Sequence, residues 1–508
     1  MTTIAELVER ASRRFSTRTA VVDGTRHLTF AEVGERSTRL ANALVGLSPR
    51  TGSSVAVLMA NRLEFVEVDF AIARAGKVKA PINPRLTDAE RSFILENCGA
   101  EVVVTDGVEF ERVRALVEDL SSPCHVVNVS DYASYGDLLA SASAQSPSVA
   151  IDPDRPSMIL HTSGTTGRPK GATTSQRARI ASMTSMLLDE FVAKPSDGMI
   201  HVAPMSHGSG SKILAYFVRG ARNVTLAKFD PRTFFEAVAS SGGTSTFVVP
   251  TMIRMLLDAP ECRPERVAGI RNITYGGAPM PLALAEEAIS VFGPVLTQVY
   301  GSCEAPHPVT VLSQEDHTKG GHEHLSSSGY ATTGVEIRLV DAAGEDAAAG
   351  EAGELWIRGA NVMSGYWGDD EATSKVLCDG WYRSGDVARL TDAGLMSIVG
   401  REREMLISGG LNVYPAEVEA VLHRHHGVSE AAVFGLPDDL WGEVVAAAIV
   451  TRKGRTASEE DILRHCMDSL AGYKLPRRII FVDSLPKGTT GKVAKTELVA
   501  MQTRERAR

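Results

Sequence analysis

Cysteine, aromatic residues and excess basic charge are all scarce in this chain of 508 residues. Its six cysteines are scattered, and no two of them form a Cys-x-x-Cys pair. This pattern fits a reducing compartment and argues against a structural zinc site. A net charge of −9 gives no support for a nucleic-acid-binding protein, which normally presents a basic face.

The sequence also lacks a run of 18 apolar residues, so we predict no membrane span. Residues 1–10 carry acidic side chains within an apolar periodicity, which indicates an amphipathic helix and not a signal peptide. We therefore expect a cytoplasmic protein. A single hydrophobic core stops growing at roughly 250–300 residues, so a chain of this length should form more than one domain.

Short apolar runs alternate with helical periodicity through much of the chain. Apolar runs flank Asp23-Gly24 and predict a hairpin, and residues 31–47 predict a helix. Buried strands are expected at residues 55–59, 101–105, 223–226, 246–249 and 270–274. Such alternation favours an α/β fold with mostly parallel sheets.

The pattern of predicted strands and helices changes twice after this region. Residues 336–340 and 353–358 predict strand, turn and strand, which indicates a small β-barrel-like module. After Arg403, helices at 415–422 and 458–469 and strands at 428–434 and 446–450 predict a small α+β domain. We therefore divide the chain into a large N-terminal domain, 1–402, and a small C-terminal domain, 403–508.

Residues 162–171 read Thr-Ser-Gly-Thr-Thr-Gly-Arg-Pro-Lys-Gly, with an apolar run just before them. Glycines let backbone N–H groups approach an anion, and the hydroxyls and Lys170 add donors and charge. The segment is not a Walker A loop, because Lys170 is followed by Gly171. Such clusters are also typical of solvated linkers, but we favour a mobile phosphate-binding loop.

Seven further stretches bear on this choice. They are Ala203–Gly210, Tyr275–Pro279, Gln298–Glu304, Gly353–Gly359, Tyr382–Asp386, Gly400–Gly410 and Pro486–Lys492. In order and approximate spacing, the whole chain resembles the acyl-adenylate-forming superfamily of acyl-CoA synthetases, peptide-synthetase adenylation domains and beetle luciferases. The resemblance implies that a carboxylate attacks the α-phosphate of ATP, that pyrophosphate leaves, and that coenzyme A then displaces AMP from the acyl-AMP.

The resemblance also implies where the nucleotide binds. The phosphates would lie on the glycine-rich loop, the base near the 277–279 turn and an aromatic ring, and the ribose on a carboxylate. The implied residues are Thr162, Ser163, Gly164, Thr165, Thr166, Gly167, Lys170, Gly277, Ala278, Pro279, Tyr300, Gly301, Cys303, Asp386 and Arg401. Cys303 stands where the family usually has threonine, and a thiol is the weaker donor.

Catalytic roles follow in the same way. Lys492 matches the lysine that bridges carboxylate and phosphate, Glu304 matches the glutamate that binds Mg²⁺, and His207 stands beside the carboxylate. Arg403 occupies the hinge about which the C-terminal domain would swing between the two steps. Gly409 and Gly410 would line the tunnel for the thiol.

For the acid pocket, the resemblance implies His207, Gly208, Ser211, Lys212, Thr251, Gly276, Ser302 and Pro306. No acidic residue stands in the 205–211 stretch to hold an α-ammonium group, so an α-amino acid is not expected. We expect Gly276 to leave room in the pocket. We expect Lys212 to extend to the surface, the alternative being contact with a second polar or anionic group of the substrate.

Aromatic, medium-chain and dicarboxylic acids all remain open as substrates, and so does a homodimer. Three alternatives to coenzyme A ligation also remain: transfer of the acyl group to a carrier protein, adenylation of nitrite with transfer to an aromatic amine, and a non-catalytic nucleotide-sensing role. The last of these is disfavoured by the presence of Lys492, Glu304, Asp386 and Arg401.

Overall fold

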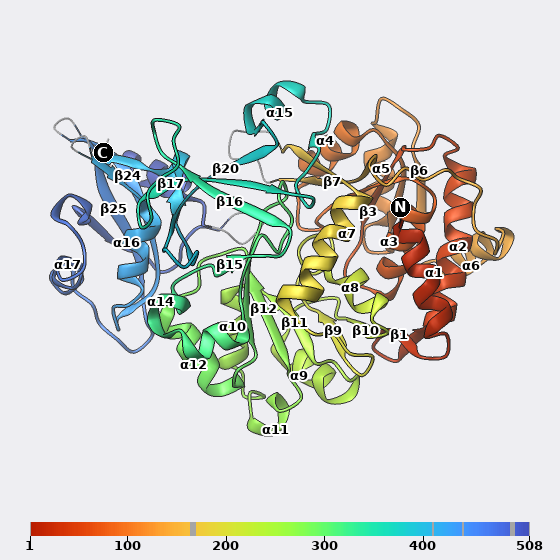
Figure 1. The fold of residues 1–508 in the computed structure, drawn as a ribbon, viewed down its shortest axis with the longest axis horizontal. Helices are drawn as coiled ribbons and strands as arrows, with labels where there is room; N and C mark the ends of the chain where they lie inside the picture. Colours follow the sequence, from red (N-terminus) through yellow and green to blue (C-terminus); the bar gives the residue numbers. More distant parts are fainter. Residues whose placement is uncertain (1, 163–168, 409–410, 439–440, 488–492, 507–508) are drawn as a thin grey trace.

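The computed structural model describes residues 2–162, 169–408, 411–438, 441–487 and 493–506. Two large sheets with their helices form most of the molecule, an antiparallel sheet adjoins them, and a smaller C-terminal unit lies at the end opposite the N-terminal helices (Figure 1). The mixed α/β fold with a separate C-terminal domain is as predicted. Among the described residues, no helix is both long and apolar enough to cross a membrane.

The larger sheet has nine strands in the order β15-β14-β13-β12-β11-β9-β10-β1-β2. Its interior pairs, from β13 to β1, are parallel, and its edge pairs are antiparallel. The strands are β1 (Thr19–Asp23), β2 (Arg26–Thr29), β9 (Gly198–His201), β10 (Arg222–Thr225), β11 (Ser245–Val248), β12 (Asn272–Gly276), β13 (Leu296–Tyr300), β14 (Thr310–Leu312) and β15 (Tyr330–Ala331).

Helices connect these strands. They are α8 (Lys212–Val218), α9 (Pro231–Ser240), α10 (Pro250–Leu257), α11 (Pro264–Val267), α12 (Leu282–Phe292), α13 (Gln314–Lys319) and α14 (Gly321–Leu325). The strand expected at 270–274 is displaced by two residues, since β12 runs from Asn272 to Gly276.

The second large sheet has seven strands in the order β18-β8-β7-β4-β3-β5-β6, parallel from β7 to β6. Its strands are β3 (Ser54–Leu58), β4 (Val78–Pro81), β5 (Ala100–Thr105), β6 (His125–Asn128), β7 (Pro156–His161), β8 (Gly171–Ser175) and β18 (Gly365–Tyr366). The accompanying helices are α1 (Ile4–Arg14), α2 (Phe30–Leu47), α3 (Leu63–Arg74), α4 (Asp88–Cys98), α5 (Phe110–Glu118), α6 (Tyr132–Ser141), α7 (Gln176–Ser185) and the π-helical turn η1 (Met186–Glu190).

Helices α2 and α3 are stabilised in different ways, α2 by its local sequence and α3 by its burial. Thr29 caps α2 through a capping box with Glu32, which satisfies free N–H groups at the start of the helix. Helix α3 is buried along its whole length within the largest hydrophobic cluster. Its acidic residue Asp69 is paired there with Lys79 and Arg179, since a buried charge without a partner is costly.

The predicted β-rich module is an antiparallel sheet in the order β16-β17-β20-β19, with β21 on β20. It comprises β16 (Val335–Val340), β17 (Ala352–Gly359), β19 (Leu377–Cys378), β20 (Trp381–Leu390), β21 (Met396–Arg401) and the helix α15 (Asp370–Val376).

The C-terminal unit has its own five-stranded sheet and its own hydrophobic clusters. It comprises η2 (Glu402–Glu404), β22 (Leu406–Ser408), β23 (Leu411–Val413), α16 (Pro415–Leu422), β24 (Val428–Asp438), β25 (Gly442–Thr451), α17 (Glu459–Met467), η3 (Gly472–Lys474), β26 (Arg478–Phe481) and α18 (Lys495–Arg506). Sheet membership changes between the end of β21 and the start of β22, and the domain limits at 402 and 403 stay a prediction.

Candidate active site

Three of the predicted site segments lie where the parallel strands of the nine-stranded sheet end. Strands β9, β11, β12 and β13 run in one direction, so the segments that follow them meet at one edge of the sheet. Residues 203–210, 277–279 and 301–306 all follow such strands. Ligands of open α/β sheets bind at this kind of edge.

The glycine-rich loop joins β7 to β8, an antiparallel pair of the other large sheet. At its base the backbone N–H of Thr162 donates to the carbonyl oxygen of Lys170 at 2.9 Å. The Lys170 ammonium lies 5.1 Å from the ring centroid of Tyr366. Five predicted phosphate-binding residues lie outside the described residues: Ser163, Gly164, Thr165, Thr166 and Gly167.

Glu304 also contacts Tyr366. The hydroxyl of Tyr366 donates to Glu304 Oε1 at 3.0 Å. Burial, and to a lesser extent the Glu304 charge, raises the pKa of that hydroxyl. The described residues contain no group of three His, Cys, Asp or Glu side chains that could hold a metal ion. Glu304 stays the predicted Mg²⁺ ligand, and a single carboxylate is compatible with an ion held mostly by phosphate oxygens and water.

A short segment, residues 363–367, connects the two halves of the predicted phosphate site. The N–H of Met363 donates to the carbonyl oxygen of Glu304 at 2.7 Å. The N–H groups of Ser364 and Trp367 donate to carbonyl oxygens of β8, each at 2.8 Å. The segment thus ties Glu304, which follows the nine-stranded sheet, to the strand that follows the glycine-rich loop.

Tyr300, Asp386 and Arg401 form a second group. Asp386 and Arg401 are register partners on β20 and β21, and Arg401 Nε lies 3.0 Å from Asp386 Oδ1. The Tyr300 hydroxyl donates to Asp386 Oδ2 at 2.5 Å. Burial and the Asp386 charge raise the pKa of Tyr300 well above its usual value. The structure thus brings together three residues implied to contact the nucleoside.

The remaining nucleotide residues flank these groups. Gly277, Ala278 and Pro279 are exposed just after β12. Gly301 allows close approach, because a Cβ there would lie 2.6 Å from the backbone nitrogen of His307. Cys303 is half-buried and packs against the core of the antiparallel sheet.

The predicted acid-pocket residues His207, Gly208 and Ser211 lie in the turn that precedes α8. The Nδ1 atom of His207 lies 2.9 Å from the Ser206 hydroxyl, and burial lowers the pKa of His207. A Cβ on Gly208 would lie 2.8 Å from the Phe247 ring, so glycine lets this ring sit against the turn. Ser211 Oγ lies 3.0 Å from Nε2 of His307, a residue that follows β13.

Lys212 does not extend to the surface, so that prediction is wrong. Its side chain is 1% exposed, and its ammonium contacts both carboxylate oxygens of Glu190, which is itself fully buried. Thr274 adds a hydroxyl that donates to Glu190 Oε1 at 2.8 Å. Burial lowers the pKa of Lys212 and the Glu190 charge opposes that shift. A neighbouring carboxylate of the protein, and not solvent, compensates the charge.

The prediction that Gly276 leaves room is also wrong. A Cβ at this position would lie 2.4 Å from the carbonyl oxygen of Val299 on the neighbouring strand. Glycine is needed there because β12 and β13 approach closely, and no space for a substrate follows from it.

The other predicted pocket and domain residues are more dispersed. Thr251 is exposed on α10, and Arg403 is exposed in η2. The Ser302 hydroxyl accepts from the backbone N–H of Ala305 at 3.0 Å, and the carbonyl oxygen of Pro306 accepts from Asn361 at 2.8 Å. These bonds shape the turn that carries Glu304. Lys492, Gly409 and Gly410 lie outside the described residues.

Sequence reasoning missed Glu190, Phe247, His307 and Tyr366. Each is brought to the site by tertiary structure: Tyr366 bonds to a carboxylate 62 residues away, and Glu190 pairs across 22 residues. Of these four residues, His307 could have been predicted from the sequence, because it stands three residues after Glu304.

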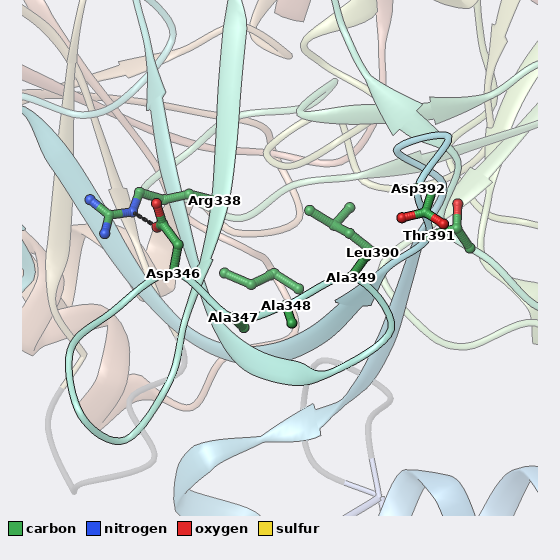
Figure 2. Close-up of a pocket in the computed structure, with 9 residues that line it drawn as sticks. Arg338, Asp346, Ala347, Ala348, Ala349, Leu390, Thr391 and Asp392 are labelled. Carbon is green, nitrogen blue, oxygen red and sulfur yellow. Dashed lines mark hydrogen bonds and ion pairs between the residues drawn. The ribbon is translucent and has the colours of Figure 1, made fainter.

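A separate cavity lies on the antiparallel sheet (Figure 2). It measures about 340 Å³ and is lined by Arg338, Leu339, Asp346, Ala347, Ala348, Ala349, Leu390, Thr391 and Asp392. Arg338 is paired with Asp346 at its edge, with 2.8 Å between Nε and Oδ1. None of the predicted site residues lines it, so we do not place the acid there.

Comparisons with known proteins agree with this geometry. The model of the AMP-binding enzyme family matches residues 8–367, and that of the AMP-binding enzyme C-terminal domain matches residues 417–492. The chain is 35% identical over 493 residues to the feruloyl-CoA synthase of an Amycolatopsis species, covering 96% of this chain and 97% of that protein. It is 34% identical over 511 residues to the indoleacetate–CoA ligase of Aromatoleum aromaticum, covering 98% and 99%.

Among solved structures, ATP-bound MatB from Rhodopseudomonas palustris superposes with a TM-score of 0.89 at 29% identity, covering 98% of this chain and 99% of that one. The fold, with its grouped nucleotide residues, defines an acyl-adenylate-forming ligase. The chain belongs to the AMP-binding enzyme family, which confirms the resemblance found in the sequence.

Proposed function

We propose that this protein uses ATP to activate a carboxylic acid and then transfers the acyl group to coenzyme A. The observation that carries the proposal is that residues from three sheets form two groups joined through Tyr300 and Glu304, which lie four residues apart at the end of β13. The first, Lys170 with Tyr366 and Glu304, suits the phosphates and Mg²⁺. The second, Tyr300 with Asp386 and Arg401, suits the nucleoside. The relatives named as CoA ligases support the choice of acceptor.

In the first step a carboxylate oxygen attacks the α-phosphorus of ATP, the bond to the bridging oxygen breaks, and pyrophosphate leaves. Lys170 and the glycine-rich loop would hold the β- and γ-phosphates, and Glu304 would hold the Mg²⁺. That ion supplies charge neutralisation between two anionic reactants. In the second step the sulfur of coenzyme A bonds to the acyl carbon, AMP leaves, and the thiol proton is released.

The test measures AMP production from a panel of carboxylic acids and from nitrite, each alone and with coenzyme A, an aromatic amine or a carrier protein as acceptor. We expect rapid AMP production only when both an acid and coenzyme A are present, with thioester in equal amount. AMP production that needs nitrite and an aromatic amine would contradict the proposal, and so would transfer only to a carrier protein. Absence of AMP under every condition would instead favour a nucleotide-sensing role.

Replacing Asp386 by asparagine should weaken ATP binding. The substitution keeps the side-chain shape but removes the charge that Arg401 contacts and that would accept the ribose hydroxyls. Loss of a charge-assisted hydrogen bond costs about 1.5–3 kcal/mol, so we expect the KM for ATP to rise about 10- to 100-fold. The measurement is initial-rate kinetics of pyrophosphate exchange at varied ATP.

Asp392→Asn is the matched control, because Asp392 is exposed in the turn between the same two strands. Its KM for ATP should equal that of the unaltered protein. Equal KM values for the Asp386 and Asp392 variants would remove Asp386 from the nucleotide site.

A further inference from the structure

His307 is a half-buried imidazole held firmly at the acid pocket. Its ring is nearly parallel to that of Phe247, with 13° between the planes and 5.5 Å between the centroids. Its backbone carbonyl accepts from the Ser182 hydroxyl at 2.6 Å. Gly301 packs against its backbone on another side. These contacts fix the direction in which the imidazole points.

The hydrogen bonds of Ser211 determine which ring nitrogen carries the proton. A serine hydroxyl has one proton, and that of Ser211 is donated to the carbonyl oxygen of Gly208 at 2.7 Å. Towards His307, Ser211 Oγ can therefore only accept, so Nε2 is the protonated nitrogen. Burial, with a smaller effect of the Lys212 charge, holds the pKa of His307 well below its usual value. The imidazole is therefore neutral, and Nδ1 carries a lone pair.

That lone pair has no hydrogen-bond donor among the residues that the structure describes. The nearby Lys212 ammonium is already paired, because it contacts both carboxylate oxygens of Glu190. The Phe247 ring covers one face of the imidazole and offers it no proton. The structure thus holds one oriented acceptor on His307, whose other ring nitrogen contacts Ser211 just after the turn that contains His207 and Gly208.

We propose that Nδ1 of His307 accepts a hydrogen bond from a hydroxyl or amino group of the bound acid. The preferred substrates are then carboxylic acids that carry such a donor in addition to the carboxylate. This inference rests on the proposed acid-activating function and adds a specificity-determining residue to it. The ion pair of Lys212 and Glu190 has a positioning role, since it anchors the start of α8 next to Ser211.

The test compares acids with and without the donor. The three hydroxybenzoates and hydroxycinnamates would be compared with their unsubstituted and methoxy counterparts, and 10-hydroxydecanoate with decanoate. The readout is kcat/KM for acid-dependent pyrophosphate exchange. The unaltered protein should favour at least one hydroxy acid over its partner by about tenfold, the effect of one buried hydrogen bond.

Two substitutions separate the ring nitrogens. In His307→Gln the amide nitrogen reaches the position of Nε2 and can still donate to Ser211, but the Nδ1 acceptor is lost. In His307→Asn the amide oxygen takes the position of Nδ1. We expect the hydroxy preference to fall to about twofold or less in the glutamine variant and to persist in part in the asparagine variant. Thermal unfolding of both variants checks that they fold.

The outcomes are distinct. Equal use of hydroxy and donor-free acids by the unaltered protein, or a preference unchanged in His307→Gln, would overturn the inference while the proposed function stands. No exchange with any acid would overturn the proposed function itself. If the glutamine variant does not fold, the preferences of the unaltered protein and of His307→Asn decide.

Discussion

Replacing Lys212 by methionine is expected to destabilise the protein strongly. Methionine fills a similar volume but leaves the Glu190 carboxylate buried, and among the described residues the Thr274 hydroxyl is then its one remaining side-chain donor. Removing one partner of a buried ion pair costs about 3–5 kcal/mol, far more than the loss of an exposed pair. We expect the urea unfolding transition to move to a correspondingly lower concentration.

Two variants sharpen this experiment. Lys319→Met removes an exposed lysine that is paired with Glu315 one helical turn away, and it should cost about 0.5 kcal/mol or less. The double variant Lys212→Met with Glu190→Gln removes both buried charges and should recover part of the lost stability. If Lys212→Met and Lys319→Met unfolded at the same urea concentration, the Lys212 and Glu190 pair could not be a dry, buried one.

Replacing Lys492 by alanine is expected to abolish adenylation and largely spare the second step. The resemblance gives this lysine the task of bridging the carboxylate and the phosphate oxygens, where charge builds up during attack on ATP. Loss of one such electrostatic contact lowers kcat by about 100- to 1,000-fold. Thioester formation from supplied acyl-AMP needs no such bridge. Pyrophosphate exchange and thioester formation are therefore measured separately.

Lys487→Ala is the control, because this lysine belongs to the same motif but is paired with Glu430, with 2.8 Å between Nζ and Oε2. It should retain both activities. Normal pyrophosphate exchange by the Lys492 variant would refute the assigned role, whereas equal loss of both half-reactions would indicate damage to the C-terminal domain as a whole.

The sequence predicts the architecture well because its local signals agree with the tertiary structure. The hairpin around Asp23-Gly24 forms as β1 and β2, with Gly24 in the left-handed region at φ 60°. Helix α16 has the predicted bounds, Pro415–Leu422. The 277–279 and 301–306 segments lie at one edge because each follows a parallel strand, and strand direction is encoded in the alternation of strands and helices.

The surroundings of the predicted acid-pocket residues were less predictable, because they depend on neighbours distant in the sequence. From the sequence, Lys212 is expected at the surface. In the structure it pairs with the buried Glu190 at the end of η1, and nothing in residues 186–190 predicts a π-helical turn. From the sequence, Gly276 is expected to leave space. In the structure the carbonyl oxygen of Val299 occupies the place that a side chain would take. Both errors arose because a residue type was interpreted without the strand or helix that packs against it.

The segment 363–367 has a consequence for how ATP is received. It fastens the base of the glycine-rich loop and the backbone of Glu304 to each other, although these belong to different sheets. The distance between the Lys170 and Glu304 regions is therefore set when the chain folds and does not have to be adjusted when the nucleotide arrives. On the proposed function, a triphosphate would meet parts of the site that are already held together, so the conformational entropy of bringing them together would not be subtracted from the binding energy.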